Sequence, residues 1–149
     1  MRLIIGGASQ GKRAYVMEAY GIREDEILDG ASMEPIKIFP IEDTSVGRTG
    51  EIACAKMEKC DEGFKCITNF HILVKRLLAD GKDPVEIAGK LVDRNPGLIV
   101  IMDEVGNGII PLEKSDRIWR EQVGRTSCLL AARAESVERI VCGLCMRIK

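Results

Sequence analysis

The sequence lacks several features that mark large functional classes of protein. It has no excess charge of either sign, since 22 Lys and Arg balance 23 Asp and Glu. This balance gives no electrostatic case for binding nucleic acid or an acidic membrane surface. No apolar run approaches the roughly 20 residues that cross a bilayer, and Gly6-Gly7 interrupts the first apolar run too early for a signal peptide. We therefore expect a cytoplasmic protein that binds neither nucleic acid nor membrane.

The sequence is also poor in histidine and in closely paired cysteines. Cys142 and Cys145 have the two-residue gap of a metal or redox pair. A zinc site would need a second such pair, and the only histidine, His71, is distant in sequence. We therefore predict reduced thiols in the core or near the surface, at residues 54, 60, 66, 128, 142 and 145.

The 149 residues are enough for one domain, residues 1–149, with a core that needs no disulfides. Apolar strand-like segments alternate with helix-like segments, and no repeat or linker interrupts them. This alternation predicts an α/β fold with a mostly parallel sheet and helices on both faces. The expected strands are 1–5, 35–39, 64–68, 98–102, 136–141 and 144–148, and the expected helices are 12–20, 51–59, a helix capped by Asn69, one starting at Asp83-Pro84, and 114–134. Residues 22–34 show no clear period, and 41–50 are expected to be a loop.

The most informative stretch joins the first strand to the first helix. It reads Gly6-Gly7-Ala8-Ser9-Gln10-Gly11-Lys12-Arg13. Two glycines with four residues between them, followed by lysine between a strand and a helix, are typical of a phosphate-binding P-loop. Backbone N–H groups and the start of the helix would hold the β- and γ-phosphates of a nucleotide, and Lys12 would add a positive charge. The alternative is a glycine-rich turn without a ligand.

One position departs from that motif. A P-loop normally continues with Ser or Thr, whose hydroxyl binds magnesium, whereas this chain has Arg13. Because arginine offers no metal-binding oxygen, we expect a weakened magnesium site.

A second acidic motif follows the most apolar strand. Leu98 to Met102 leads directly into Asp103-Glu104. A carboxylate at the end of such a strand can hold magnesium directly or through water, and a second can orient a nucleophile. We predict Asp103 and Glu104 as metal ligands, with Glu104 as a general base. The alternative is an acidic pair on an ordinary surface.

Three further features allow two interpretations each. The segment 106–111, with Gly106 and Gly108, either permits close approach of a ligand or is a flexible turn. Gly124 costs the long helix about 1 kcal/mol relative to alanine, which indicates a packing or ligand reason, whereas Arg125 fits a solvated face. His71 is either a nucleophile or proton carrier, or a half-buried helix residue whose imidazole bonds a carbonyl. We prefer the latter because the sequence shows no partner.

The order of motifs resembles one enzyme family from end to end. The relevant segments are Gly6 to Lys12, Cys66-Ile67-Thr68, Glu104 to Pro111, Gly124-Arg125 with Leu129 to Ala132, and Gly143 to Lys149. The chain resembles the bifunctional adenosylcobinamide kinase / adenosylcobinamide-phosphate guanylyltransferase family of cobalamin biosynthesis. The resemblance implies a P-loop fold, a homotrimer, ATP or GTP with Mg²⁺, and a corrinoid acceptor. It also implies two reactions: phosphorylation of the aminopropanol hydroxyl of adenosylcobinamide, and transfer of GMP to that phosphate through a guanylylated histidine.

The chain departs from the family at three chemically necessary groups. Arg13 replaces the hydroxyl residue, and Lys65 replaces an acidic residue before Cys-x-Thr. No histidine lies between Gly30 and Gly50, where the family carries its guanylylated one. We therefore expect a kinase whose guanylyltransferase step is absent or impaired. The alternatives are a degenerate homologue that binds nucleotide or corrinoid in a regulatory or partner role, and an unrelated small P-loop kinase.

Overall fold

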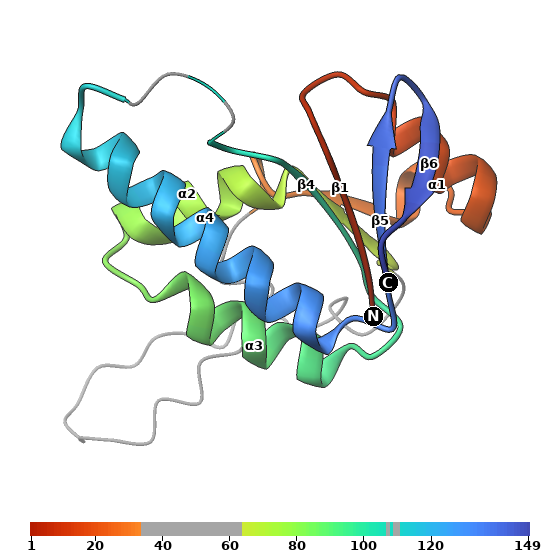
Figure 1. The fold of residues 1–149 in the computed structure, drawn as a ribbon. Coiled ribbons are helices and arrows are strands. Elements are labelled where there is room, and N and C mark those ends of the chain that lie inside the picture. The colour runs from red at the N-terminus through yellow and green to blue at the C-terminus, as the bar shows by residue number, and fades with distance from the viewer. Residues whose placement is uncertain (34–63, 107, 109–110) are drawn as a thin grey trace, which may run out of the picture.

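A computed structural model describes residues 1–33, 64–106, 108 and 111–149. These residues form one six-stranded sheet in the order β2-β3-β4-β1-β5-β6 (Figure 1). The strands are β1 Arg2–Gly6, β2 Ile27–Asp29, β3 Cys66–Thr68, β4 Ile99–Asp103, β5 Ser136–Val141 and β6 Leu144–Arg147. β1 to β5 pair in parallel, and β6 returns antiparallel to β5. The predicted α/β fold with a mostly parallel sheet is confirmed.

Helices cover both faces of this sheet, as expected (Figure 1). On one face α1 (Lys12–Tyr20) buries Val16 against Ile4, Ile101 and Ile140. On the other, α2 (Phe70–Ala79), α3 (Pro84–Arg94) and α4 (Lys114–Arg133) pack on the sheet through residues such as Leu73. In the part of the chain that is described, no helix is both long and apolar enough to cross a membrane.

Local sequence signals explain the starts and ends of several helices. The Asp83 side chain accepts hydrogen bonds from the N–H groups of Val85 and Glu86, so it caps α3 as predicted. Asn69 also stands at the start of α2, but its side chain donates to Asp29 across the sheet edge and makes no cap bond. The Asn69 amide is thus oriented by a contact with Asp29, 40 residues away in sequence, and not by the N–H groups of its own helix.

The structure corrects the prediction for residues 22–34. They contain a short 3₁₀ turn, Glu24–Glu26, and the edge strand β2. A three-residue strand is too short to show a hydrophobic period. The strand expected at 35–39, the loop at 41–50 and the helix at 51–59 lie outside the described residues.

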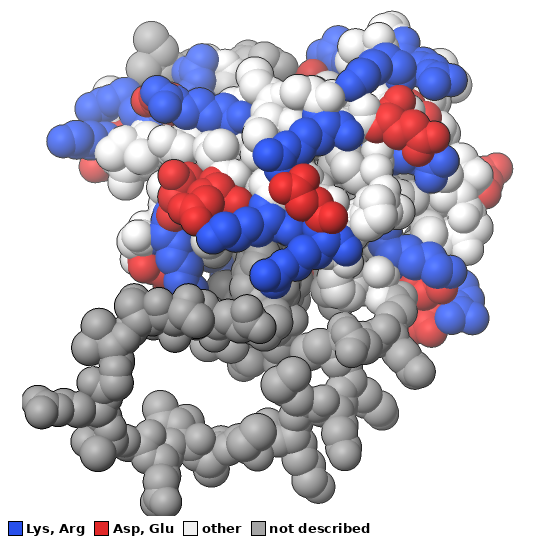
Figure 2. All heavy atoms as spheres, turned by 90° about the horizontal axis from the view of Figure 1, so that it is seen from below, with Lys and Arg blue, Asp and Glu red and all other residues white. Residues whose placement is uncertain are grey.

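Charges of both signs are mixed on the face that includes α3. Arg133 pairs with Asp93, and Lys90 pairs with Glu86. Figure 2 shows blue and red side chains interleaved on this face, as the charge balance of the sequence leads one to expect.

The carboxyl ends of the parallel strands, which carry polar residues, lie along the same side of the sheet. Gly6 is in register with Asp103, and Asp29 with Thr68. Gly6 has a φ of 152°, and a Cβ there would lie 2.3 Å from the carbonyl oxygen of Ile140. Glycine is therefore required where the chain leaves β1, because no side chain fits against β5.

Candidate functional site

The loop between β1 and α1 is held by the turn between β5 and β6. The carbonyl oxygen of Gln10 accepts from the N–H of Gly143 at 3.0 Å, and its side-chain Oε1 accepts from the N–H of Cys142 at 2.6 Å. Gly11, at the end of the loop, has a left-handed conformation with a φ of 82°. The loop is thus fixed by non-local hydrogen bonds as well as by its own glycines.

α1 is tied to the same strand pair through a buried carboxylate. Glu138 on β5 accepts hydrogen bonds from the hydroxyls of Tyr15 at 3.0 Å and Tyr20 at 2.7 Å. Burial, followed by the Glu138 interaction, raises the pKa of Tyr20 to about 12. These bonds anchor the helix whose first residue is Lys12.

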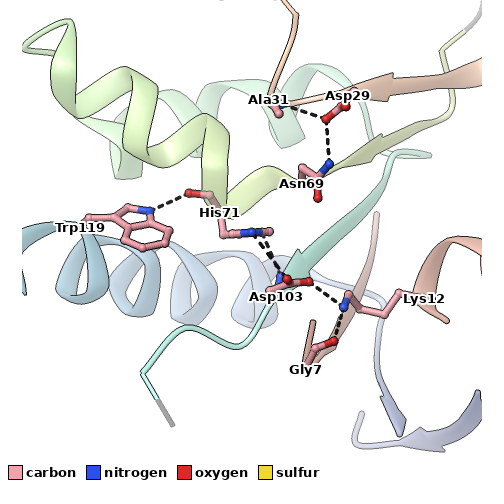
Figure 3. A network of polar contacts seen from close by, with 8 residues as sticks. All are labelled: Gly7, Lys12, Asp29, Ala31, Asn69, His71, Asp103 and Trp119. Atoms are coloured by element: carbon pink, nitrogen blue, oxygen red, sulfur yellow. Dashed lines mark hydrogen bonds and ion pairs between the residues drawn. The ribbon is translucent and has the colours of Figure 1, made fainter. Parts of the chain in front are cut away.

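Lys12 points toward Asp103 and the Gly7 carbonyl (Figure 3). Its Nζ donates to the carbonyl oxygen of Gly7 at 2.6 Å and forms an ion pair with Asp103 Oδ1, also at 2.6 Å. The Lys12 side chain is only 7% exposed. A buried ammonium needs such partners, and they hold its charge between the loop and the end of β4.

A cavity of about 350 Å³ lies over this group. It is lined by residues 8–14 of the loop and first helical turn, and by Thr68, Asn69, Ile101 and Asp103. Of the predicted phosphate-binding residues, Ala8 to Arg13 border the cavity, whereas Gly6 and Gly7 shape the backbone beneath it. Thr68 and Asn69 also border the cavity, although neither was predicted as a site residue. The position of Cys-x-Thr at the end of a strand was the available signal.

The two predicted acidic residues separate at the end of β4. The Asp103 carboxylate faces Lys12, whereas Glu104 Oε2 accepts two hydrogen bonds from Arg139, at 3.0 and 3.1 Å. Successive residues of an extended chain point to opposite faces, which explains the split. The structure therefore brings Asp103, but not Glu104, into the lining of the cavity.

The described residues contain no group of three or more His, Cys, Asp or Glu side chains able to hold a metal by themselves. Mg²⁺ needs fewer protein ligands, because nucleotide phosphates and water complete its octahedron. The Asp103 carboxylate, 24% exposed beside the cavity, fits that partial role. Arg13 adds no ligand oxygen, and its guanidinium instead pairs with Glu24.

His71 lies next to Asp103 although 32 residues separate them (Figure 3). Its Nδ1 accepts from the backbone N–H of Asp103 at 3.1 Å, and its Nε2 is 3.6 Å from Asp103 Oδ2. Burial lowers the pKa of His71, with Lys12 acting in the same direction and Asp103 opposing it. His71 is thus a buried helix residue bonded to an N–H group, where we had expected a half-buried one bonded to a carbonyl.

Four of the six cysteines are among the described residues, one of them in the core and three near the surface. Cys66 is buried, and burial raises its pKa to about 12. Cys128, Cys142 and Cys145 are exposed and free. Cys54 and Cys60 lie outside the described residues.

Comparison with known proteins identifies one family. A family model described as cobinamide kinase / cobinamide phosphate guanyltransferase matches residues 66–148, from β3 through β6. The match includes Asp103, Glu104 and Gly124-Arg125, and it begins after the glycine-rich loop. No curated protein matches the chain. Because the matched segment spans more than half of the 149 residues, the chain belongs to the cobinamide kinase / cobinamide phosphate guanyltransferase family.

Proposed function

We propose that this protein is a nucleotide-dependent phosphotransferase that uses ATP or GTP to phosphorylate a hydroxyl group of cobinamide. The observation that carries the proposal is the position of Lys12, whose Nζ lies 2.6 Å from both the Gly7 carbonyl oxygen and Asp103 Oδ1, beside a cavity bordered by loop backbone. That arrangement suits a triphosphate, because loop N–H groups and one fixed cation meet its negative charge.

The reaction would transfer the terminal phosphoryl group in one displacement. The acceptor oxygen forms a bond to the γ-phosphorus, the bond from that phosphorus to the bridging oxygen breaks, and the nucleoside diphosphate leaves with the bonding electrons. The hydroxyl proton passes to Glu104, the proposed general base, and Lys12 balances charge on the phosphates. Mg²⁺ held by Asp103 and the nucleotide would supply further charge neutralisation. By resemblance to its family, the protein would act as a homotrimer.

Transfer of a labelled phosphate tests this function. The protein is incubated with adenosylcobinamide and either ATP or GTP labelled at the γ-phosphate. We expect label in the corrinoid, at a faster rate with the preferred nucleotide, and loss of transfer in Lys12→Ala. Nucleotide binding without any transfer would contradict kinase activity.

That contrary outcome defines a second candidate, a homologue that binds nucleotide or corrinoid in a regulatory or partner role. This second candidate is favoured by Arg13 and Lys65, which stand where the family has a hydroxyl and an acidic residue. The Arg13 guanidinium pairs with Glu24, and Lys65 Nζ lies 2.7 Å from Glu26 Oε1. Both cations thus have protein partners, and neither offers an oxygen ligand for a metal.

The position of Arg13 predicts an unusual metal dependence. Because Asp103 is left as the proposed protein ligand, magnesium should improve triphosphate binding less than it does when a hydroxyl residue follows the P-loop lysine. Arg13→Ser should therefore increase the ratio of affinities measured by calorimetry with and without magnesium. A large ratio in the wild type that Arg13→Ser leaves unchanged would refute this explanation.

A further inference from the structure

A second and larger hollow lies at the same sheet edge as the phosphate cavity. It has a volume of about 870 Å³ and runs between the chain that follows β4 and the outer side of α4. Val105, Gly106 and Pro111 border it on one side, and Gly124 and Cys128 on the other. We call this hollow the α4 groove. Its volume exceeds the roughly 300 Å³ at which ligand pockets begin, and the phosphate chemistry described above does not use it.

Two arginines of α4 lie against described residues that border the groove on its other side. Arg117 donates to the carbonyl oxygens of Pro111 and Leu112. Arg120 lies so close to Gly106 that a Cβ there would be 2.7 Å from its Nε, and Gly106 has a φ of 122°. Arg117 therefore ties Pro111 and Leu112 to α4, and the Arg120 side chain packs against Gly106.

Gly124 has no packing reason to be glycine. It lies in the interior of α4, where glycine weakens a helix. A Cβ at Gly124 would meet no described atom within 4 Å, in contrast to Gly106. Yet Gly124 faces the groove. Because Gly124 has no side chain, a bulky ligand in the groove could approach the backbone of α4 directly at this position.

The polar lining supplies mainly hydrogen-bond donors. Arg117, Arg120 and Arg125 border the groove with one carboxylate, Glu121, which pairs with Arg125 at 2.7 Å. Arginine carries five N–H donors and no acceptor. Such a lining suits a ligand with carbonyl oxygens or other acceptors at its rim, above an apolar floor.

Chain order links the groove to the phosphate cavity. Asp103 lines the cavity, Val105 lines the groove, and Glu104 stands between them. The groove therefore begins one residue beyond the proposed base, Glu104, and two residues beyond Asp103 of the cavity.

We propose that the α4 groove binds the phosphoryl acceptor, a corrinoid whose amide-bearing rim faces the arginines and whose ring lies over Gly124. This inference rests on the proposed function. It assigns Gly124, Arg120 and Arg125 to acceptor binding and leaves the nucleotide to the P-loop.

Titration calorimetry with adenosylcobinamide tests the assignment. Gly124→Leu fills the groove, and Ala132→Leu adds the same side chain to an exposed position of α4 away from it. We expect Gly124→Leu to weaken acceptor binding at least tenfold, Ala132→Leu to bind as the wild type does, and both to bind ATP normally. The melting temperature of Gly124→Leu should equal or exceed that of the wild type, because leucine favours a helix more than glycine does.

The outcomes separate the two proposals. Wild-type affinity for adenosylcobinamide in a folded Gly124→Leu variant would overturn the groove assignment and leave the kinase proposal standing. A wild-type protein that binds ATP but shows no heat with adenosylcobinamide would overturn the proposed acceptor, and the groove assignment with it. As a second probe of the lining, Arg125→Gln and Arg120→Gln should each weaken acceptor binding, and unchanged affinity in both would exclude the proposed donors.

Discussion

Replacement of Lys12 by alanine is expected to weaken nucleoside triphosphate binding at least tenfold, which corresponds to about 1.4 kcal/mol. Lys12 Nζ is held 2.6 Å from the Gly7 carbonyl and 2.6 Å from Asp103, so its charge is already fixed at the loop before a ligand binds. A preorganised cation loses little conformational freedom on binding. The same substitution should abolish phosphoryl transfer, because the developing charge on the phosphates would lose its nearest protein cation.

The experiment needs variants that separate charge from folding. Lys12→Ala also leaves the Asp103 carboxylate without its ion-pair partner, so thermal unfolding must show that each variant is folded. Lys12→Gln keeps a hydrogen-bond donor on a side chain one atom shorter and removes the charge. Lys90→Ala, which removes an exposed lysine paired with Glu86 on α3, serves as the matched control. Wild-type affinity in folded Lys12→Ala and Lys12→Gln would remove the central claim about this site.

The parts of the fold that the sequence predicted are those with local causes. Asp83 caps α3 because its side chain reaches N–H groups two and three residues ahead. The apolar run before Asp103 became the central strand β4, since β-branched residues flanked by turns suit a strand buried on both faces. The glycine-rich loop was likewise recognisable, because spacing alone sets where its backbone can turn.

The parts that escaped prediction depend on neighbours distant in sequence. His71 bonds to Asp103 because α2 packs beside the end of β4. The Asn69 side chain bonds to Asp29 on another strand and does not cap its own helix. Glu104 follows Asp103 directly, yet its carboxylate is bonded to Arg139 of β5. No periodicity or spacing within one segment encodes these contacts, since each is set by which strands become neighbours in the sheet.

The position of His71 leads to the last prediction, that the guanylyltransferase half-reaction is absent or strongly impaired. A histidine nucleophile must present an unprotonated ring nitrogen to the α-phosphate. In His71 the lone pair of Nδ1 already accepts the Asp103 N–H, so the proton of the neutral ring belongs on Nε2. Because burial lowers the pKa of His71, the ring is neutral at pH 7. Neither nitrogen therefore offers a free lone pair, and His71 as a whole is only 7% exposed.

Residues 30–50, where family members carry the guanylylated histidine, contain none here, and offer Ser32, Lys37, Thr44 and Ser45 instead. A serine or threonine ester would be too stable to relay GMP, and a lysine with its ordinary pKa is protonated at neutral pH. The test is incubation with GTP labelled at the α-phosphate, with a family member that has the histidine in this segment as positive control. We expect no acid-labile, base-stable label on this chain, and no difference between the wild type and His71→Ala. A stoichiometric phosphoramidate on His71 would contradict the prediction. It would require the Asp103–His71 hydrogen bond to break during turnover, and it would restore both activities of the family with a relocated nucleophile.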